Sequence, residues 1–357
     1  MAKVLMKGNE AIGEAAIQAG CKNYFAYPIT PQSEVAEYLA KRMPEVDGVF
    51  VQGESEVAVG YMIFGAAACG ERVMTTSSSP GISLMSEALS YIAGARCPAV
   101  FVNIMRGGPG LGGILPSQGD YFQATKGGGH GDYRLLVMAP EGVQEAVDMT
   151  MSAFKLAEKY RGPVMILGDG LIGQMMEPVE FPENFDVSPA NNDDWATNGM
   201  DTRKSDKKNI VKSLYLDPTA LNEHNLLLKS NYERMKREDV RYEGYNTDTE
   251  YKLLIVSYGS MSRVCKTAID LMKAEGLEIG MIRPQTLFPF PENAIHDAAV
   301  KPSCSQVVSI ELNMGQMVED VDRCVKGQRP VTWYGECGGD VPSPEDIIDH
   351  VKSLLKE

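Results

Sequence analysis

The sequence of 357 residues lacks long hydrophobic runs and an excess of positive charge. No apolar stretch approaches the roughly 20 residues that cross a bilayer, so we expect no membrane segment. The beginning, MAKVLMKGNEAIGEAA, lacks the cleavage-site pattern of a signal peptide. The formal net charge is −14, which argues against nucleic acid or an anionic membrane surface as the main partner.

Clustered metal ligands are also missing. The four histidines are scattered, and none of the seven cysteines forms a C-x-x-C pair. Structural zinc and iron–sulfur clusters need grouped ligands, so we expect this chain to hold neither. An odd number of cysteines without a spacing pattern indicates reduced thiols, as in the cytoplasm.

The first 180 residues alternate short β-type runs with longer helical patterns. The expected strands lie at 23–27, 48–52, 72–76, 99–104, 134–138 and 163–167, and the expected helices at 31–42, 54–69, 83–95 and 141–159. Runs that are hydrophobic on both faces and separated by helices predict an α/β domain with a parallel sheet.

Two further regions follow this domain. Residues 181–250 are polar, and Asp217-Pro218 predicts the N-cap and the first residue of a charged helix. We interpret this region either as an arm that covers the surface or a partner subunit, or as a solvated linker. A second α/β pattern begins at Tyr251, so we predict domains at 1–180 and 251–357, joined by the polar arm 181–250.

Two apparent cofactor motifs lack the local structure that they require. The G-x-G-x-x-G at 108–113 follows a strand, but Pro116 interrupts the helix that a dinucleotide fingerprint needs. The Gly-Asp-Gly at 168–170 and the asparagines at 191–192 imitate a metal-diphosphate motif, but a proline-rich segment replaces the helix between them. We therefore expect neither a nicotinamide or flavin site nor a complete diphosphate site in this chain.

Two glutamates stand at the start of a predicted helix, in VQGESEVAVGYMIFGAAACG. The helix is apolar nearly all round and should be buried, and the helix dipole alone would favour a carboxylate in its first turn. Glu54 and Glu56 cannot share a face, because a single residue separates them. One can therefore reach solvent while the other enters a cleft, where a buried carboxylate is a candidate for proton relay.

Arg106 follows the predicted strand AVFVNI and precedes a segment with ten glycines between Gly107 and Gly131. An arginine at the end of a strand is well placed to bind a carboxylate with two N–H groups. So many glycines exceed what packing needs, and they indicate close backbone approach or a mobile lid.

The segment YPITPQSE, at 27–34, places two prolines around Ile29 and Thr30 where a strand passes into a helix. Thr30 as N-cap and Pro31 as the first helical residue would explain the second proline but not Pro28. The turn also lies at the carboxyl end of a strand, where ligands bind in open α/β sheets. We therefore hypothesise that the two prolines hold Thr30 against a substrate.

The order of these segments resembles one family. A strand followed by YPITP, then Ser-Glu before a helix of small residues, then TSSSPG, then a strand ending in arginine, is similar to the α subunits of the 2-oxoacid:ferredoxin oxidoreductases. In the second domain, IRPQTLFPFP and VVSIELNMGQM carry the likeness, which covers almost the whole chain. The resemblance implies a thiamine-diphosphate-binding domain of the pyrimidine type followed by a transketolase C-terminal-like α/β domain.

The resemblance also implies roles for three residues. Glu56 matches the glutamate that hydrogen-bonds N1′ of the aminopyrimidine of thiamine diphosphate and favours its imino tautomer. Thr30 matches a threonine that lines the substrate pocket, and Arg106 matches an arginine that binds the carboxylate of the 2-oxoacid. Glu54 has no such counterpart.

The reaction that the resemblance implies is the oxidative decarboxylation of a 2-oxoacid to an acyl-CoA and CO2, with coenzyme A as co-substrate and ferredoxin as electron acceptor. The chain lacks cluster cysteines and a complete diphosphate-binding domain, so it should be inactive alone. Thiamine diphosphate would be shared with a β subunit that carries the diphosphate-binding domain and magnesium. A γ subunit and a ferredoxin-like iron–sulfur subunit would complete the complex, with 4Fe–4S clusters on partner subunits.

The resemblance favours 2-oxoisovalerate as substrate, with 2-oxoglutarate as the alternative. A 2-oxoglutarate enzyme should add a second cation near the substrate tail, and Lys126 and Arg134 are present in the sequence. Two further alternatives are a catalytically decayed assembly subunit and a transketolase-like enzyme that acts alone. The joint presence of Thr30, Glu56 and Arg106 argues against decay.

Overall fold

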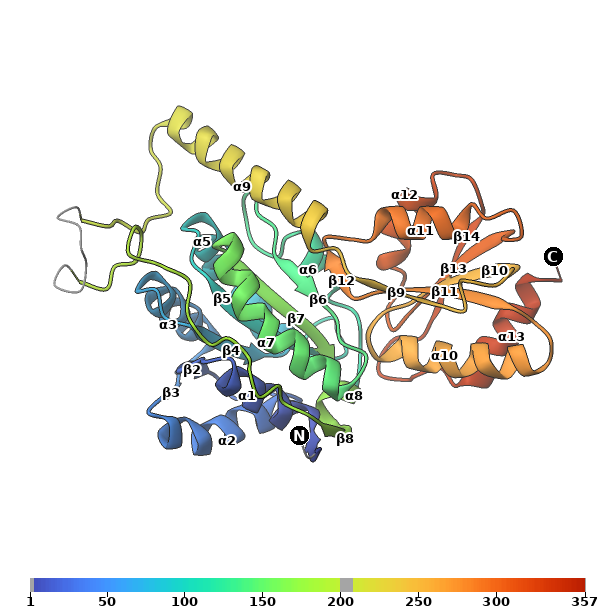
Figure 1. Cartoon of the computed structure of the whole chain (residues 1–357), viewed down its shortest axis with the longest axis horizontal. Coiled ribbons are helices and arrows are strands. Elements are labelled where there is room, and N and C mark those ends of the chain that lie inside the picture. The colour runs from blue at the N-terminus through green and yellow to red at the C-terminus, as the bar shows by residue number, and fades with distance from the viewer. Residues whose placement is uncertain (1–2, 200–207, 357) are drawn as a thin grey trace.

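Two mainly parallel sheets organise the chain (Figure 1). The computed structural model describes residues 3–199 and 208–356. Within these residues the first sheet has seven strands in the order β12-β6-β7-β5-β4-β2-β3, and the second has five in the order β14-β13-β10-β11-β9. Only the edge strands β12 and β9 pair antiparallel to their neighbours in these two sheets. The prediction of an α/β fold with parallel sheets is therefore confirmed.

The strands of the first sheet are β2 (Asn23–Ala26), β3 (Val49–Gln52), β4 (Val73–Ser77), β5 (Ala99–Met105), β6 (Leu136–Met138), β7 (Pro163–Asp169) and β12 (Thr286–Phe288). Those of the second are β9 (Tyr242–Tyr245), β10 (Leu253–Val256), β11 (Ile279–Pro284), β13 (Gln306–Glu311) and β14 (Val331–Gly335). A small antiparallel pair joins β1 (Val4–Lys7) to β8 (Met176–Val179).

The first sheet is covered on both faces because its strands are apolar on both sides. In β5, Phe101 contributes to one core cluster, whereas Val100 and Val102 contribute to the other. The first cluster includes residues of α3 (Glu56–Ala68), α4 (Ser79–Leu84) and α5 (Ser86–Gly94). The second includes residues of α1 (Gly8–Gln18), α2 (Ser33–Arg42) and α7 (Val143–Tyr160).

The second sheet is covered in the same way. Its helices are α10 (Gly259–Ala274), α11 (Glu292–Ala299), α12 (Met317–Val325) and α13 (Pro344–Leu354). The short elements η1 (Met43–Val46), α6 (Tyr121–Lys126) and α8 (Gly170–Gln174) belong to connections of the first domain. No helix within residues 3–199 and 208–356 is both long and apolar enough to cross a membrane.

The polar region between the domains lies on the surface of the first domain over its described part. Arg72 donates hydrogen bonds to the carbonyl groups of Val187 and Ser188, at 2.9 and 3.0 Å. The long helix α9 (Pro218–Glu238) then crosses the molecule as a separate ribbon (Figure 1). Asp217 caps it by accepting a hydrogen bond from the Thr219 backbone, so this predicted N-cap is confirmed.

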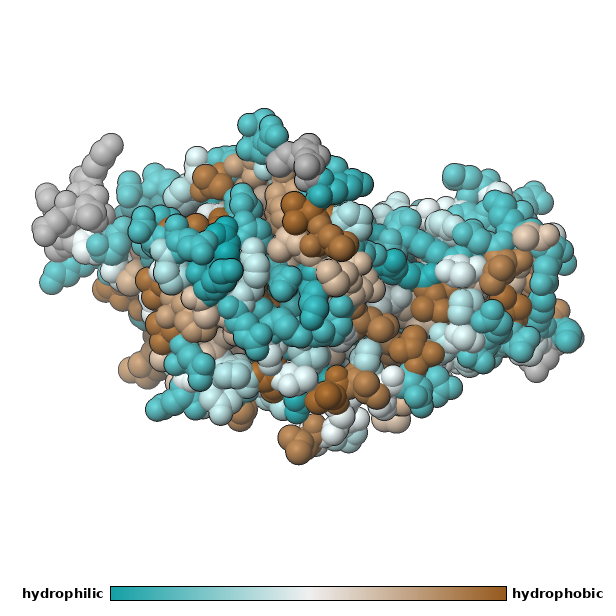
Figure 2. Space-filling view, turned by 90° about the horizontal axis from the view of Figure 1, so that it is seen from below, coloured by the Kyte–Doolittle hydropathy of each residue, from teal (hydrophilic) through white to brown (hydrophobic). Residues whose placement is uncertain are grey.

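Strand exchange joins the two domains. β9 precedes residue 251 and pairs with β11 of the second sheet, whereas β12 leaves the second domain to pair with β6 of the first. One core cluster continues across the boundary, and the rings of Tyr121 and Tyr258 lie 5.8 Å apart in it. On the face drawn in Figure 2, apolar side chains gather over the first domain and the boundary, whereas the second domain is mostly hydrophilic.

Candidate active site

The polar residues singled out by the sequence lie at the carboxyl edge of the first sheet. We use this name for the turns that follow β2, β3, β4 and β5, at 27–32, 53–56, 78–81 and 106–120. These four strands are neighbours in the sheet, so their turns share one edge. Since neighbouring strands are about 4.8 Å apart, the turns after β3 and β5 are separated by roughly 14 Å. The turns after β4 and β2 lie between them.

The YPITP turn is built differently from the prediction. α2 begins at Ser33, with Gln32 at the N-cap position and no side-chain cap, so the prediction of Thr30 as N-cap is wrong. Residues distant in sequence hold the turn instead, because the buried Asn9 amide donates to the Pro31 carbonyl at 2.8 Å. The Gln32 amide donates to the carbonyl of Tyr27. The side chain of Thr30 is exposed and has no capping role.

Arg106 and Thr30 are brought together through the backbone. Arg106 follows β5 as predicted, and its side chain is buried, with 8% exposure. Its Nη1 donates to the Thr30 carbonyl at 3.0 Å, and its Nη2 donates to the Leu111 carbonyl at 3.2 Å. The buried Nε has no hydrogen-bond partner among the described residues. The guanidinium is therefore fixed in place while it retains N–H groups for a further acceptor.

The two glutamates diverge as expected. Ser55 is the N-cap of α3 and accepts a hydrogen bond from the Ala58 backbone at 3.2 Å. Glu54 is exposed, whereas Glu56, the first residue of the helix, is 7% exposed. Among the described residues, the carboxylate of Glu56 has neither an ion pair nor a side-chain hydrogen bond. This mostly buried carboxylate is therefore available to accept a hydrogen bond from a ligand.

A glycine makes room for this carboxylate. A Cβ at Gly81 would lie 2.8 Å from Glu56 Oε1 and 2.1 Å from Ser77 Oγ, so a larger residue would displace both. The hydroxyl groups of Ser77 and Ser78 are buried without hydrogen-bond partners in the described part of the chain. One carboxylate and two unpaired hydroxyls therefore gather after β3 and β4. This donor and acceptor set fits the polar edge of an aminopyrimidine ring.

Asp120, a half-buried carboxylate that the sequence analysis missed, links the turns after β4 and β5. Asp120 accepts hydrogen bonds from Ser79 Oγ at 2.6 Å and from Asn103 Nδ2 at 2.8 Å. Ser79 Oγ also accepts one from the Arg106 backbone at 3.1 Å. Burial raises the pKa of the Asp120 carboxyl, and these two hydrogen bonds oppose the rise. The available sequence signal was Asn103, a polar residue inside an otherwise apolar strand.

The Gly-rich segment shows the close backbone approach that the sequence indicated. A Cβ at Gly112, where φ is +60°, would lie 1.9 Å from the Gly107 carbonyl oxygen. Further along, Gln118 Nε2 donates to the Tyr258 carbonyl at 2.9 Å, and its backbone N–H donates to the Leu312 carbonyl at 2.8 Å. The segment therefore joins the carboxyl edge to the strand ends of the second domain.

The imitated metal-diphosphate motif does not form a site. Asp169 caps α8 by accepting hydrogen bonds from the backbone of Leu171 and Ile172, and it accepts another from Ser260. Asn192 instead donates to the carbonyl of Gly70, just before β4, at the opposite edge of the sheet. Within residues 3–199 and 208–356, no group of three or more histidine, cysteine or acidic side chains could hold a metal ion.

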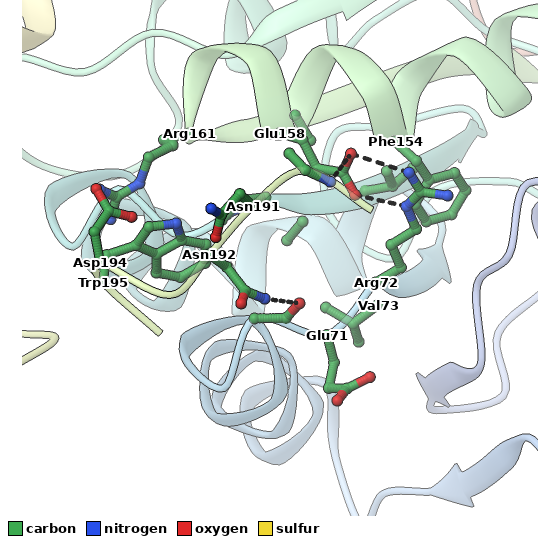
Figure 3. Close-up of a pocket in the computed structure, with 16 residues that line it drawn as sticks. Glu71, Arg72, Val73, Phe154, Glu158, Arg161, Asn191, Asn192, Asp194 and Trp195 are labelled. Atoms are coloured by element: carbon green, nitrogen blue, oxygen red, sulfur yellow. Dashed lines mark hydrogen bonds and ion pairs between the residues drawn. The ribbon is translucent and has the colours of Figure 1, made fainter. Parts of the chain in front are cut away.

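A well-defined pocket lies at the amino edge, where β4 and β5 begin (Figure 3). It encloses about 660 Å³, open mouth included, between α7 and residues 190–195. Thr30, Glu56 and Arg106 do not line it. Arg72 forms two hydrogen bonds with Glu158, at 2.6 and 3.0 Å, and three more with backbone carbonyl groups. These five hydrogen bonds occupy all the side-chain N–H groups of Arg72, so its pairing with Glu158 is structural.

Comparison with known families identifies the domains. Residues 14–243 match the family described as pyruvate flavodoxin/ferredoxin oxidoreductase, thiamine diphosphate-binding, and residues 252–347 match pyruvate:ferredoxin oxidoreductase core domain II. The chain belongs to the 2-oxoacid:ferredoxin oxidoreductase family. The predicted resemblance is confirmed, and the first domain is the family's thiamine-diphosphate-binding domain.

Individual members of the family are similar over the full chain. The ketoisovalerate oxidoreductase subunit VorB of Methanothermobacter thermautotrophicus is 46% identical over 99% of this chain and 98% of its own length. The 2-oxoglutarate synthase subunit KorA of Archaeoglobus fulgidus is 36% identical over 98% of this chain and 99% of its own.

Solved structures support the same assignment. The 2-oxoglutarate:ferredoxin oxidoreductase of Magnetococcus marinus superposes with a TM-score of 0.85 at 29% identity over 99% of this chain. This chain spans 65% of the length of that solved chain. A split-gene transketolase, at 14% identity and a TM-score of 0.58, shares the fold.

Proposed function

We propose that the chain is a subunit of a 2-oxoisovalerate:ferredoxin oxidoreductase. In this reaction one 2-oxoacid and one coenzyme A give one acyl-CoA, one CO2 and one proton, while two ferredoxins each accept one electron. Thiamine diphosphate supplies the electron sink for decarboxylation when it is bound. The relatives named as ketoisovalerate oxidoreductase subunits, at 45 and 46% identity over almost their full length, support the choice of substrate.

Three residues of the carboxyl edge carry the proposed roles. The buried carboxylate of Glu56 accepts a hydrogen bond from N1′ of the aminopyrimidine, and this contact favours the imino tautomer. Arg106 binds the carboxylate of the 2-oxoacid with its free N–H groups. Thr30 lines the substrate pocket, and its carbonyl group holds Arg106 in orientation. The chain therefore contributes tautomer control and substrate positioning.

The observation that carries the substrate proposal is the absence of charged residues from the loop 107–119 that follows Arg106. The next charged residue along the chain is Asp120, and the loop between them exposes the apolar side chains of Leu111, Ile114 and Leu115. Such a loop suits a branched apolar tail better than a second carboxylate.

The two cations considered for a 2-oxoglutarate tail have other partners. Lys126 Nζ is 2.5 and 2.6 Å from the two oxygens of Asp320. Arg134 donates to the Thr125 carbonyl and lies over the ring of Phe288. The KorA relatives keep 2-oxoglutarate as the alternative substrate, and these contacts favour 2-oxoisovalerate over it.

The remaining parts of the enzyme are assigned to other subunits. We assign the diphosphate-binding domain and magnesium to a β subunit, and the 4Fe–4S clusters to partner subunits that include a γ subunit and a ferredoxin-like subunit. The relatives named as subunits of oxidoreductases support a heteromeric complex. All seven cysteines of this chain are free, which suits the reducing cytoplasm.

The test is a substrate comparison with the complex purified from native extract. We expect reduction of ferredoxin, dependent on coenzyme A, with kcat/KM for 2-oxoisovalerate at least about 10-fold above those for 2-oxoglutarate and pyruvate, or about 1.4 kcal/mol. A preference for 2-oxoglutarate would reverse the substrate assignment. Thiamine-dependent turnover by the isolated chain would contradict the proposed division among subunits.

A further inference from the structure

Two arginines near the amino edge have no acidic partner among the described residues. Arg96 follows α5 and precedes β5, while Arg161 ends α7 and precedes β7. β5 and β7 are paired neighbours, so the two arginines lie side by side where these strands begin. Both line a pocket of about 830 Å³, open mouth included. This size is within the usual range for small-molecule sites.

The guanidinium groups of these arginines are half-buried and unsatisfied. Neither makes an ion pair or a side-chain hydrogen bond to any residue in the described part of the chain, and both Nε atoms are buried without a partner. Arg72, at the same edge, instead uses five hydrogen bonds. Arg161 does make a cation–π contact, because its Cζ lies 4.3 Å from the centre of the Trp195 ring (Figure 3).

The charges in this pocket are unbalanced. Its described lining contains four cations and one acid, namely Arg96, Arg161, Lys208, Lys212 and Asp194. The pocket therefore carries three excess positive charges in a chain whose net charge is −14. Burial lowers the pKa of both arginines, and the positive charge of Arg96 lowers that of Arg161 further, whereas the charge of Asp194 opposes the shift in both. An anion would relieve this repulsion and occupy the free N–H groups.

We propose that this pocket binds a phosphorylated small molecule through the guanidinium groups of Arg96 and Arg161. Two adjacent guanidinium groups can each take two phosphate oxygens, and the exposed Lys212, which also lines the pocket, adds a third cation. The three excess charges match a diphosphate or a nucleoside diphosphate better than a monocarboxylate. Because both Nε atoms are buried, the ligand must bind the Nη groups of the two guanidinium groups. The site lies at the opposite edge of the sheet from Glu56 and Arg106, and it is independent of the proposed catalytic roles.

The experiment is calorimetric titration of the purified full-length chain at low ionic strength with inorganic pyrophosphate, ADP and adenosine. We expect pyrophosphate and ADP to bind with affinity that falls as salt is added, and adenosine not to bind. Equal affinity for the first two probes would assign the site to the diphosphate group alone. Tighter binding of ADP would assign it to a nucleotide. Absence of binding by both charged probes would overturn the proposal.

Variants locate the binding. R96Q/R161Q should weaken binding of pyrophosphate at least about 30-fold, and K212Q about 3-fold, since Lys212 is exposed and its loss leaves the fold intact. R323Q is the matched control, because Arg323 is an exposed arginine outside this pocket, and it should leave binding unchanged. Circular dichroism would establish that each variant is folded. The assignment of this pocket as the pyrophosphate site would be overturned by wild-type affinity in both R96Q/R161Q and K212Q. It would also be overturned if R323Q lost as much affinity as R96Q/R161Q.

Discussion

The two edges of the first sheet differ in how their polar groups are satisfied. At the amino edge the most enclosed arginine, Arg72, uses five hydrogen bonds and pairs with Glu158. At the carboxyl edge the hydroxyl groups of Ser77 and Ser78 are buried without hydrogen-bond partners among the described residues, and the mostly buried Glu56 makes no side-chain hydrogen bond or ion pair there. A well-formed cavity alone would favour the amino edge, whereas unsatisfied groups at the ends of parallel strands favour the carboxyl edge. Unpaired groups also occur at the amino edge, on Arg96 and Arg161, so the proposal of an active site at the carboxyl edge rests on its place at the ends of parallel strands as well as on its unpaired groups, and not on cavity shape.

The largest expected effect is at Glu56. Replacing it with glutamine removes the proposed carboxylate contact to the cofactor, and we expect turnover of the reconstituted complex to fall about 10³-fold, or about 4 kcal/mol in the activation barrier. The measurement is ferredoxin reduction dependent on the 2-oxoacid. E54Q is the matched control, because Glu54 is exposed two residues away, and it should keep wild-type turnover. An equal loss of turnover in E56Q and E54Q would contradict the specific role proposed for Glu56.

Arg72 should show the opposite behaviour. R72Q leaves Glu158 without its cation in a buried pair, so we expect the free energy of unfolding to fall by about 3 kcal/mol. Urea denaturation of the full chain measures this, and turnover per folded molecule should be unchanged. R323Q removes an exposed arginine that pairs with Glu292 and Asp320, and because Lys126 still pairs with Asp320, it should cost no more than about 1 kcal/mol. A stable R72Q variant with impaired turnover would place function at the amino edge.

Arg106 should affect the substrate more than the fold. We expect R106Q to lower kcat/KM for the 2-oxoacid about 10²-fold, mainly through KM, because a bidentate contact with a carboxylate is lost. R106K retains the positive charge but loses the two parallel N–H groups, so its kcat/KM should lie between those of wild type and R106Q. Steady-state kinetics at saturating thiamine diphosphate measures both variants. An unchanged KM in R106Q would contradict the role of Arg106 in binding the carboxylate.

Gly81 tests whether the space beside Glu56 matters. G81A places a methyl group 2.8 Å from Glu56 Oε1, so the carboxylate must move, and we expect the affinity for thiamine diphosphate to fall about 10-fold. Titration of the apo complex with the cofactor measures this affinity. A Cβ at Gly65 would point into open space, so G65A is the control that should bind normally. Normal binding by G81A would show that Glu56 tolerates displacement.

The smallest effect is expected at Thr30. Its backbone carbonyl, which accepts from Arg106, is retained in T30A, so only the side-chain contribution to the pocket is lost. We expect KM for the 2-oxoacid to rise about 3-fold, with no change in thermal midpoint because the side chain is exposed. A loss of stability without a change in KM would make Thr30 a structural residue.

The sequence predicted the fold class and the first six strands of the large sheet because buried parallel strands are continuous apolar runs. It also separated Glu54 from Glu56 correctly, since residues on either side of a single position cannot share a helix face. Local patterns failed where distant residues decide the conformation. The distant Asn9 holds the YPITP turn together with Gln32 of the segment itself, and α2 begins only at Ser33, so Thr30 has no capping role.

Other features required the tertiary structure. The segment IGMIRPQTLFPF divides into β11 and β12, which belong to different sheets, and nothing in its periodicity marks the exchange. The hydrogen bonds of Asp120 to Ser79 and Asn103 span 41 and 17 positions of sequence. A single sequence does not reveal such pairs, although Asn103 in an apolar strand was a visible exception.

The most direct test of the account is the exchange of the C2 hydrogen of thiamine diphosphate in the reconstituted complex, followed by NMR after dilution into D2O. Because the proposed contact of Glu56 acts on the aminopyrimidine before substrate binds, E56Q should slow this exchange about 10²- to 10³-fold. R106Q should leave the exchange at the wild-type rate. Exchange at the wild-type rate in E56Q, with the cofactor bound at full stoichiometry, would contradict the assignment of the carboxyl edge as the cofactor-activating site.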